Sequence, residues 1–302
     1  MVTAENLVKN FHGFAALDHV SMHVPKGVIY GLVGPNGAGK STIIRHIAGI
    51  YRPDNGQVLV DGVPVYENSF VKSRIAYIPD DLYYFFQAST LEMKHFYANL
   101  YPEFDKKLFD RLQEFFPSIN PKQSIRRLSK GMQKQSAFWL ALCCNPSLLV
   151  LDEPVDGLDP VMRRQIWNLI LKRVEERGTT VLISSHNLRE LEDVCNYVGI
   201  MHKGRILLER SLSELQGSVV KLQIVFEESD AGIPALPPQL QVLHMSNLGR
   251  VYTIIARGEP EELRALLAPL HPLLVDILPL SLEEIFIYEM GGADYAVKDI
   301  LF

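Results

Sequence analysis

The sequence has few cysteines and no long apolar run. Only three cysteines occur in 302 residues, Cys143, Cys144 and Cys195. Two of them are adjacent and none has zinc-ligand spacing, so we expect buried free thiols and a reducing compartment, and no disulfide framework. No apolar run approaches the roughly 20 residues that a membrane helix needs. If the protein works at a membrane, another chain must supply the span.

Two further features have little presence in the sequence, an apolar leader pattern and a basic excess. The first residues, MVTAENLVKN, include an early acid and no apolar core, so we expect no signal peptide. Lysine and arginine number 30 against 35 acidic residues, a net charge of −5. This balance argues against a nucleic-acid partner. A composition of 47% hydrophobic and 22% charged residues is that of a globular protein with one large and one small domain.

Apolar strands alternate with helical patterns along the first two thirds of the chain. Val28–Val33, Leu148–Asp152 and Thr180–Ser184 are continuous apolar runs, typical of strands buried on both faces. Pro160–Glu176 reads as a helix that Gly178 closes, and Asn187–Cys195 as a second helix. The alternation predicts an α/β fold with a parallel sheet covered on both faces.

Two other regions differ from this pattern. Residues from about 85 to 145 are mostly helical, beginning with the capping-box pair Ser89 and Glu92. The composition changes near Gly217, and residues 216–302 suggest a separate α+β domain with strands at Val219–Phe226 and Val251–Ala256. A helix is predicted over residues 282–289.

The stretch GPNGAGKS at Gly34–Ser41 follows a buried strand and opens a helix, the setting that a phosphate-binding loop requires. Its glycines let backbone N–H groups turn toward phosphates, and Lys40 adds a positive charge. Ser41 offers a hydroxyl to Mg²⁺.

Two further motifs supply acids and a helix start. LLVLDE ends a buried strand with Asp152, placed to bind Mg²⁺, and Glu153, placed to act as a general base on water. LSKGMQ opens a helix at Ser129, whose hydroxyl and neighbouring N–H groups can contact an anion.

The motifs GPNGAGKS, LSKGM, LLVLDEP, GLDP and SSH occur in the order found in one family. Over about residues 1–215 the chain resembles the ATP-binding subunit of an ABC transporter. Lys130 and Met132 replace the commoner Gly and Gln, a form that resembles ABC-2-type drug and peptide exporters. The resemblance implies a P-loop NTPase core with an N-terminal antiparallel β-subdomain, a helical insertion at about 85–145 and a small C-terminal α+β domain at 216–302.

The resemblance also implies roles for matching residues. Two such subunits pair head to tail around two ATP and drive an integral membrane permease from the cytoplasmic face of the cell membrane. Asp152 would bind Mg²⁺ and Glu153 would polarise the attacking water. His186 would contact the γ-phosphate, and Asp159 would link the two ATP sites. Ser129, Lys130 and Gly131 reach the γ-phosphate of the partner's ATP. Phosphates and Mg²⁺ lie against Gly34, Pro35, Asn36, Gly37, Ala38, Gly39, Lys40, Ser41 and Thr42. Phe11, with Phe14 as a rival, stands where an aromatic stacks on adenine; either could instead pack in the core.

The stretch YIPDDLYYFF departs from the family at one position. Asp80 stands where the family has a Gln that reaches Mg²⁺ and the attacking water. Three interpretations follow: Asp80 replaces Gln as a metal and water contact, the loop is looser and hydrolysis slow, or the site is the weak half of an unequal pair. The aromatics Tyr83 to Phe86 either anchor a helix of the membrane subunit or pack within the helical insertion.

Two other functions compete with a transport ATPase. A soluble ABC-type ATPase is one, although such proteins usually have two ATPase cores or a long coiled-coil insertion, and this sequence has neither. A regulatory ATP-binding subunit is the other, and Asp80 is its only support.

Overall fold

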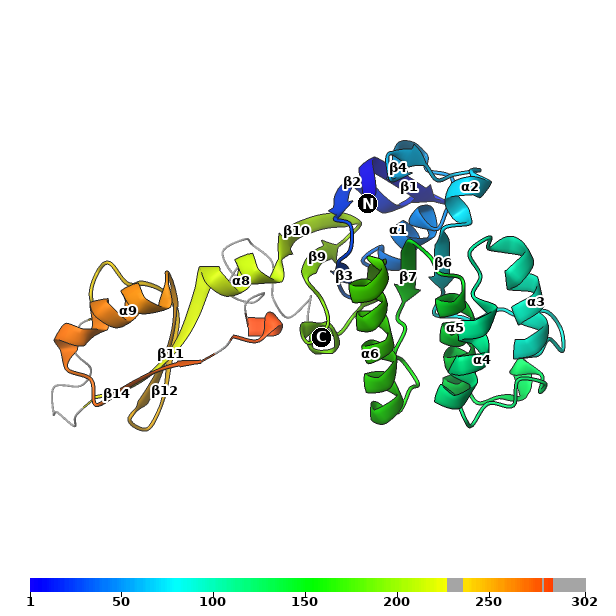
Figure 1. Cartoon of the computed structure of the whole chain (residues 1–302). Helices are drawn as coiled ribbons and strands as arrows, with labels where there is room; N and C mark the ends of the chain where they lie inside the picture. The colour runs from blue at the N-terminus through cyan, green and yellow to red at the C-terminus, as the bar shows by residue number, and fades with distance from the viewer. Residues whose placement is uncertain (227–235, 279, 285–302) are drawn as a thin grey trace. The chain divides into compact units, whose positions relative to one another are not determined.

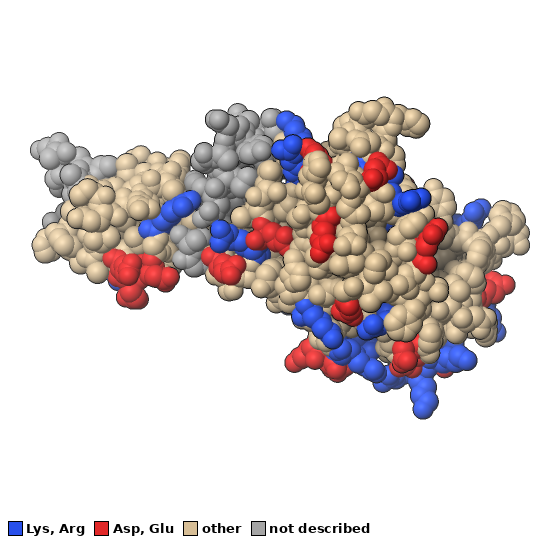
Figure 2. Space-filling view, turned by 90° about the horizontal axis from the view of Figure 1, so that it is seen from above, with Lys and Arg blue, Asp and Glu red and all other residues tan. Residues whose placement is uncertain are grey.

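The computed structural model describes residues 1–226, 236–278 and 280–284 of the chain. The chain forms two compact units, Met1–Glu209 and Arg210–Phe302, which are described separately. Among the described residues, no helix combines the length and the apolar character that crossing a membrane requires. Charged side chains of both signs are interspersed over the face drawn in Figure 2.

A six-stranded sheet forms the centre of the first unit, with the strand order β10-β9-β3-β8-β7-β6 (Figure 1). Every residue of β3, β7 and β8 is buried, as continuous apolar runs require, and the pairs among β6, β7, β8, β3 and β9 are parallel. The strands are β3 (Ile29–Val33), β6 (Ile75–Ile78), β7 (Leu148–Asp152), β8 (Thr180–Ser185), β9 (Tyr197–His202) and β10 (Arg205–Ser211). This arrangement confirms the predicted α/β fold.

Helices α6 (Pro160–Arg177) and α7 (Arg189–Glu192) connect strands of this sheet, whereas α1 (Lys40–Ile47) follows β3 and leads to a second sheet. The sequence signals of α6 are confirmed, since the Asp159 carboxylate accepts the Met162 N–H and Gly178 ends the helix with a φ of 65°. The prediction for the helix at 187–195 was too long, because only α7 is regular. Beyond it the chain turns so that the Asn196 side chain accepts the N–H of Ile29.

An antiparallel sheet with the order β2-β1-β4-β5 covers α1. Its inner side chains share one core with α1 and the central sheet, so Leu7 and Val20 pack in the same cluster as Ile43. The predicted turn at Asp61-Gly62 is present, with φ of 50° and 77° at the two residues. The strands are β1 (Val2–Phe11), β2 (Phe14–Val24), β4 (Asn55–Val60) and β5 (Val63–Pro64), and the short helix α2 (Ser69–Lys72) follows.

The predicted helical insertion is also present. Its elements are α3 (Thr90–Leu100), α4 (Lys106–Phe115), the 3-10 turn η1 (Ile125–Arg127) and α5 (Lys130–Cys143). Ser89 and Glu92 form the predicted capping box. Trp139 of α5 is fully buried and stacks against Phe109 and Phe116. The three cysteines are buried and free, and burial raises the pKa of each thiol.

The second unit contains an antiparallel sheet with the order β12-β13-β11-β14. Leu222 and Ile254 of the sheet pack with Leu263 and Leu267 of α9. The elements are α8 (Leu212–Ser218), β11 (Val219–Val225), β12 (Gln241–Leu248), β13 (Val251–Arg257), α9 (Pro260–Leu267), the 3-10 turn η2 (Ala268–Leu270) and β14 (Leu274–Leu278). The helix predicted over 282–289 lies largely outside the described residues.

Candidate active site

The loop between β3 and α1 has a conformation that only its glycines permit. Gly37 and Gly39 have φ of 80° and 108°, a region that side chains other than glycine rarely adopt. A Cβ on Gly34 would lie 2.1 Å from the carbonyl oxygen of Met201. The backbone of Gly34 therefore lies directly against β9, and the start of α1 offers its N-terminal N–H groups and dipole to an anion.

The side chain of Lys40 lies back across this loop. Its Nζ donates to the carbonyl oxygens of Gly34 at 2.6 Å and Pro35 at 3.2 Å. The same atom lies 3.5 Å from Oε1 of Glu153, and the side chain is 5% exposed. Burial lowers the pKa of Lys40, and Glu153 opposes that effect. The ammonium is thus held beside the loop with a carboxylate as its counter-ion.

Ser41, Asp152 and Ser184 form a chain of oxygen atoms at the end of β7. Oδ1 of Asp152 accepts the hydroxyl of Ser41 at 3.1 Å and that of Ser184 at 2.6 Å. The carboxylate is buried, with only 1% of the residue exposed. A serine hydroxyl and a carboxylate are hard oxygen donors, the type that Mg²⁺ prefers, so the residues fit this metal. Thr42 follows in the first turn of α1, and its carbonyl oxygen accepts a hydrogen bond from Nδ1 of His46.

Every polar group of Glu153 has a partner. Its φ is 45°, and its backbone N–H donates to the carbonyl and the hydroxyl of Ser184. Its carbonyl accepts Nζ of Lys134 at 2.6 Å. Its carboxylate contacts Lys40 and lies 2.9 Å from Nδ1 of His186. A carboxylate held at so many points needs little reorganisation, a property that suits a general base.

Two residues near Glu153 were not predicted. Ligand atoms of Asp156, Glu153 and His186 all lie within 4.8 Å of one another. Lys134 lies 3.5 Å from Oδ1 of Asp80, whose side chain is 55% exposed. Lys134 follows the LSKGMQ motif directly, but 54 positions separate it from Asp80, so only the fold brings them together.

The signature segment and the segment after β7 contact each other. Ser129 caps α5 by accepting the Met132 N–H at 3.3 Å, and Lys130 is the first residue of that helix. A Cβ on Gly131 would lie 2.7 Å from the carbonyl oxygen of Gly157. The glycine therefore permits close approach of the two backbones.

The candidate adenine contact lies at the end of β1. Phe11 is 36% exposed, and its ring meets Tyr51 edge-on at 5.6 Å. Lys9 places its Nζ 5.5 Å from the same ring. Phe14, at 65% exposure, is its register partner across the hairpin. Both aromatics are thus on the surface rather than in the core, and neither is excluded.

The aromatics after β6 divide into two groups. Tyr84 is partly buried, and burial raises its pKa above the usual value. Tyr83, Phe85 and Phe86 are 87%, 57% and 77% exposed. Phe85 also meets Phe96 of α3 edge-on at 4.9 Å. Tyr84 is therefore the most buried of the four, and the other three side chains are exposed to solvent.

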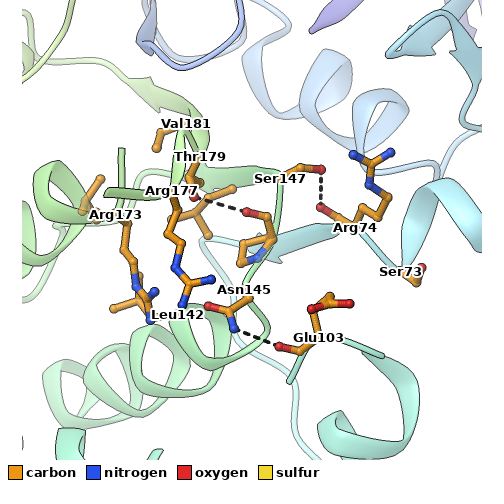
Figure 3. Close-up of a pocket in the computed structure, with 13 residues that line it drawn as sticks. Ser73, Arg74, Glu103, Leu142, Asn145, Ser147, Arg173, Arg177, Thr179 and Val181 are labelled. Atoms are coloured by element: carbon orange, nitrogen blue, oxygen red, sulfur yellow. Dashed lines mark hydrogen bonds between the residues drawn. The ribbon is translucent and has the colours of Figure 1, made fainter. Parts of the chain in front are cut away.

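A cavity of about 270 Å³ lies elsewhere, beside the start of β6, β7 and β8 (Figure 3). The phosphate loop follows the opposite, carboxyl end of a parallel strand, so the cavity is not part of the site described above. Arg173 and Arg177 of α6 point toward it, and burial, with the charge of Arg177, lowers the pKa of Arg173. Other lining residues include Arg74, Glu103, Leu142, Asn145, Leu149 and Ile170.

A phosphate loop on β3, an acid pair on β7 and a capped signature helix define the class: a P-loop ATPase of the ABC type. The family model described as "ABC transporter" matches residues 17–156. The chain is 32% identical over 292 residues to the ABC transporter ATP-binding protein YtrB of Bacillus subtilis, covering 97% of this chain and 99% of that protein. It belongs to the family of ABC transporter ATP-binding proteins and is an ATPase of that family.

Other relatives and solved structures are also ATP-binding proteins of ABC transporters. The bacitracin transport ATP-binding protein BcrA of Enterococcus faecalis is 32% identical over 237 residues, 78% of this chain and 77% of that protein. A solved structure described as the ATP-binding subunit of an ABC transporter superposes with a TM-score of 0.66 at 26% identity, covering 72% of this chain and 92% of that chain.

Proposed function

We propose that the chain works as one of two ATP-binding subunits that close around two MgATP and drive a separate membrane permease, in the direction of export. The observation that carries the ATPase chemistry is Glu153, which is held by Lys40 and His186 beside Asp152 and the phosphate loop. Relatives named for bacitracin transport support the exporter assignment. The chain would then lie on the cytoplasmic face of the membrane.

The residues divide the reaction between them. Lys40 and the backbone N–H groups of the loop bind the phosphates, and Ser41 with Asp152 holds Mg²⁺. Mg²⁺ held by these two residues would supply positive charge that offsets the negative charge of the phosphates. Glu153 orients the attacking water and takes its proton. His186 orients that carboxylate and offers a second contact to the γ-phosphate.

The proposed dimer uses surfaces that do not belong to the chain's own phosphate loop. Ser129, Lys130 and Gly131 would complete the partner's site, with the Ser129 hydroxyl and the start of α5 facing the γ-phosphate. Asp159 already caps α6, so it would link the sites through the position of that helix. Support comes from the contact between Gly131 and Gly157, which ties the signature helix to the segment after β7.

The test is steady-state ATPase of the full chain with Mg²⁺ at high protein concentration, with Glu153→Gln as the matched control. We expect the wild type to hydrolyse ATP and Glu153→Gln to lose at least about 100-fold in kcat while still binding ATP. If both proteins bind ATP and both show the same background rate, the proposal that this chain alone hydrolyses ATP is wrong.

A catalytically weak ATP-binding half remains a second candidate, and one observation favours it. Asp80 stands where the family usually has Gln, and its side chain is 55% exposed, as expected for a looser loop. If the wild type shows only background hydrolysis until an unlike ATPase subunit is added, this second function is the correct one.

A further inference from the structure

Lys134 is a buried cation between two segments of the candidate site. It lies early in α5 and is 6% exposed. Its Nζ donates to the carbonyl oxygen of Glu153 at 2.6 Å and lies 3.5 Å from Oδ1 of Asp80. Because a buried ammonium is unfavourable unless it is paired, these two oxygens explain how a lysine is tolerated at this position.

The first contact fixes the backbone of the general base. Glu153 has a φ of 45°, an uncommon conformation for a residue with a Cβ. In that conformation its carbonyl oxygen accepts a hydrogen bond from Lys134, and its N–H donates to Ser184. Its carboxylate contacts Lys40 and His186. The hydrogen bond from Lys134 therefore stabilises the backbone geometry that presents the carboxylate.

The second contact concerns the charge of Asp80. A carboxylate beside a triphosphate is electrostatically unfavourable unless a cation offsets it. Lys134 supplies such a cation from within the same chain, at 3.5 Å. Asp80 can therefore be accommodated at this position without relying on the metal alone.

We propose that Lys134 is a positioning residue for ATP hydrolysis, which holds the Glu153 backbone and neutralises Asp80. It lies on the same helix as the signature residue Ser129, which caps α5. Through its Nζ atom, Lys134 thus connects the signature helix, to which it belongs, with the loop after β6 and with the general base. This inference rests on the proposed ATPase function.

The experiment compares Lys134→Met, Lys134→Arg, Asp80→Asn and the double variant Lys134→Met/Asp80→Asn in the full chain. Lys134→Met is expected to lower kcat at least about tenfold and to change KM for ATP less than about threefold, since the role is in turnover and not in binding. Lys134→Arg keeps the charge and is expected to keep about a third or more of kcat.

The double variant separates positioning from folding. Adding Asp80→Asn to Lys134→Met removes the uncompensated carboxylate, so part of the lost kcat is expected to return. A purely structural lysine would give no such recovery. If Lys134→Met does not fold, Lys134→Gln takes its place and must show the same recovery.

Each failure has its own signature. Wild-type turnover in Lys134→Met, or a double variant whose kcat is no higher than that of Lys134→Met, overturns the role of Lys134 and leaves the proposed function intact. A wild type that binds ATP but hydrolyses it no faster than Glu153→Gln overturns the proposed function and this inference together.

Discussion

The hydroxyl of Ser184 lies 2.6 Å from Oδ1 of Asp152, and its oxygen accepts the N–H of Glu153 at 3.1 Å. One serine at the end of β8 therefore holds both acids at the end of β7. Parallel register produces this arrangement, because Asp152 and Ser184 are direct neighbours across the two strands. Ser184 therefore orients the carboxylate that we propose as a Mg²⁺ ligand, and it is not itself one of the proposed ligands.

Ser184→Ala is expected to weaken the response to Mg²⁺. The substitution leaves one contact of Asp152 unmade, so the Mg²⁺ concentration for half-maximal ATPase should rise about tenfold. A Mg²⁺ titration of ATPase activity measures this, and Ser184→Thr, which keeps the hydroxyl, should remain close to wild type. An unchanged titration in Ser184→Ala would show that Ser41 alone suffices to orient Asp152.

Gly131→Ala is expected to impair hydrolysis and to lower stability. In a helix this exchange ordinarily raises stability by up to about 1 kcal/mol. Here the new Cβ would lie 2.7 Å from the carbonyl of Gly157, so the backbones must separate, at a cost of about 1–3 kcal/mol. Urea denaturation and ATPase assays on the same preparation measure both effects. A more stable variant with wild-type ATPase would contradict the close contact.

Local signals in the sequence predicted much of the fold and the site. The strand Leu148–Asp152, the capping box at Ser89 and the turn at Asp61 are specified by neighbouring residues, and each is confirmed. The loop at Gly34–Ser41 is also specified by contiguous residues, and its conformation is present, while its contacts with phosphate stay a prediction.

Features that depend on distant segments were not predicted. Lys134 and Asp80 are far apart in the sequence, and each looks like an ordinary charged residue until α5 packs beside β6. The contact of Ser184 with Asp152 depends on strand order, which no local pattern specifies. The helix predicted at 187–195 is shorter in the structure, because Asn196 binds the backbone of β3 and redirects the chain.

His46 is expected to make the first unit sensitive to acid. It is 1% exposed, its Nδ1 contacts the carbonyl of Thr42 at 2.8 Å, and its Nε2 has no hydrogen-bond partner. Burial lowers its pKa below the ordinary value of 6.5. Between the lowered pKa and 6.5 the unfolded chain binds more protons than the folded one, so stability falls as the pH falls below about 6.5.

The measurement is the urea midpoint at pH 5, 6 and 8 for the wild type and His46→Phe. The phenyl ring keeps the edge-on contact with Tyr51, whose centroid lies 5.7 Å from the imidazole, and it cannot be protonated. The loss of stability between pH 8 and pH 5 should therefore be smaller in the variant. Parallel pH curves for the two proteins would assign the acid sensitivity to other groups.

The exposed aromatics after β6 are expected to bind the permease and not to support the fold. Tyr83 and Phe86 are 87% and 77% exposed, and the guanidinium of Arg126 lies 5.3 Å from the Phe86 ring. Changing both aromatics to Ala should alter the free energy of unfolding by less than about 0.5 kcal/mol, because little buried area is lost.

Co-purification with the membrane subunit from detergent should fall sharply in the Tyr83→Ala/Phe86→Ala variant, because aromatic side chains dominate the energy of such interfaces. The ATPase rate of the isolated chain should stay near wild type. Leu248→Ala is the matched control, since Leu248 is also 87% exposed but lies on β12 of the second unit. If the double variant retains the permease as well as Leu248→Ala does, the aromatic surface has another role and the permease contact lies elsewhere on the chain.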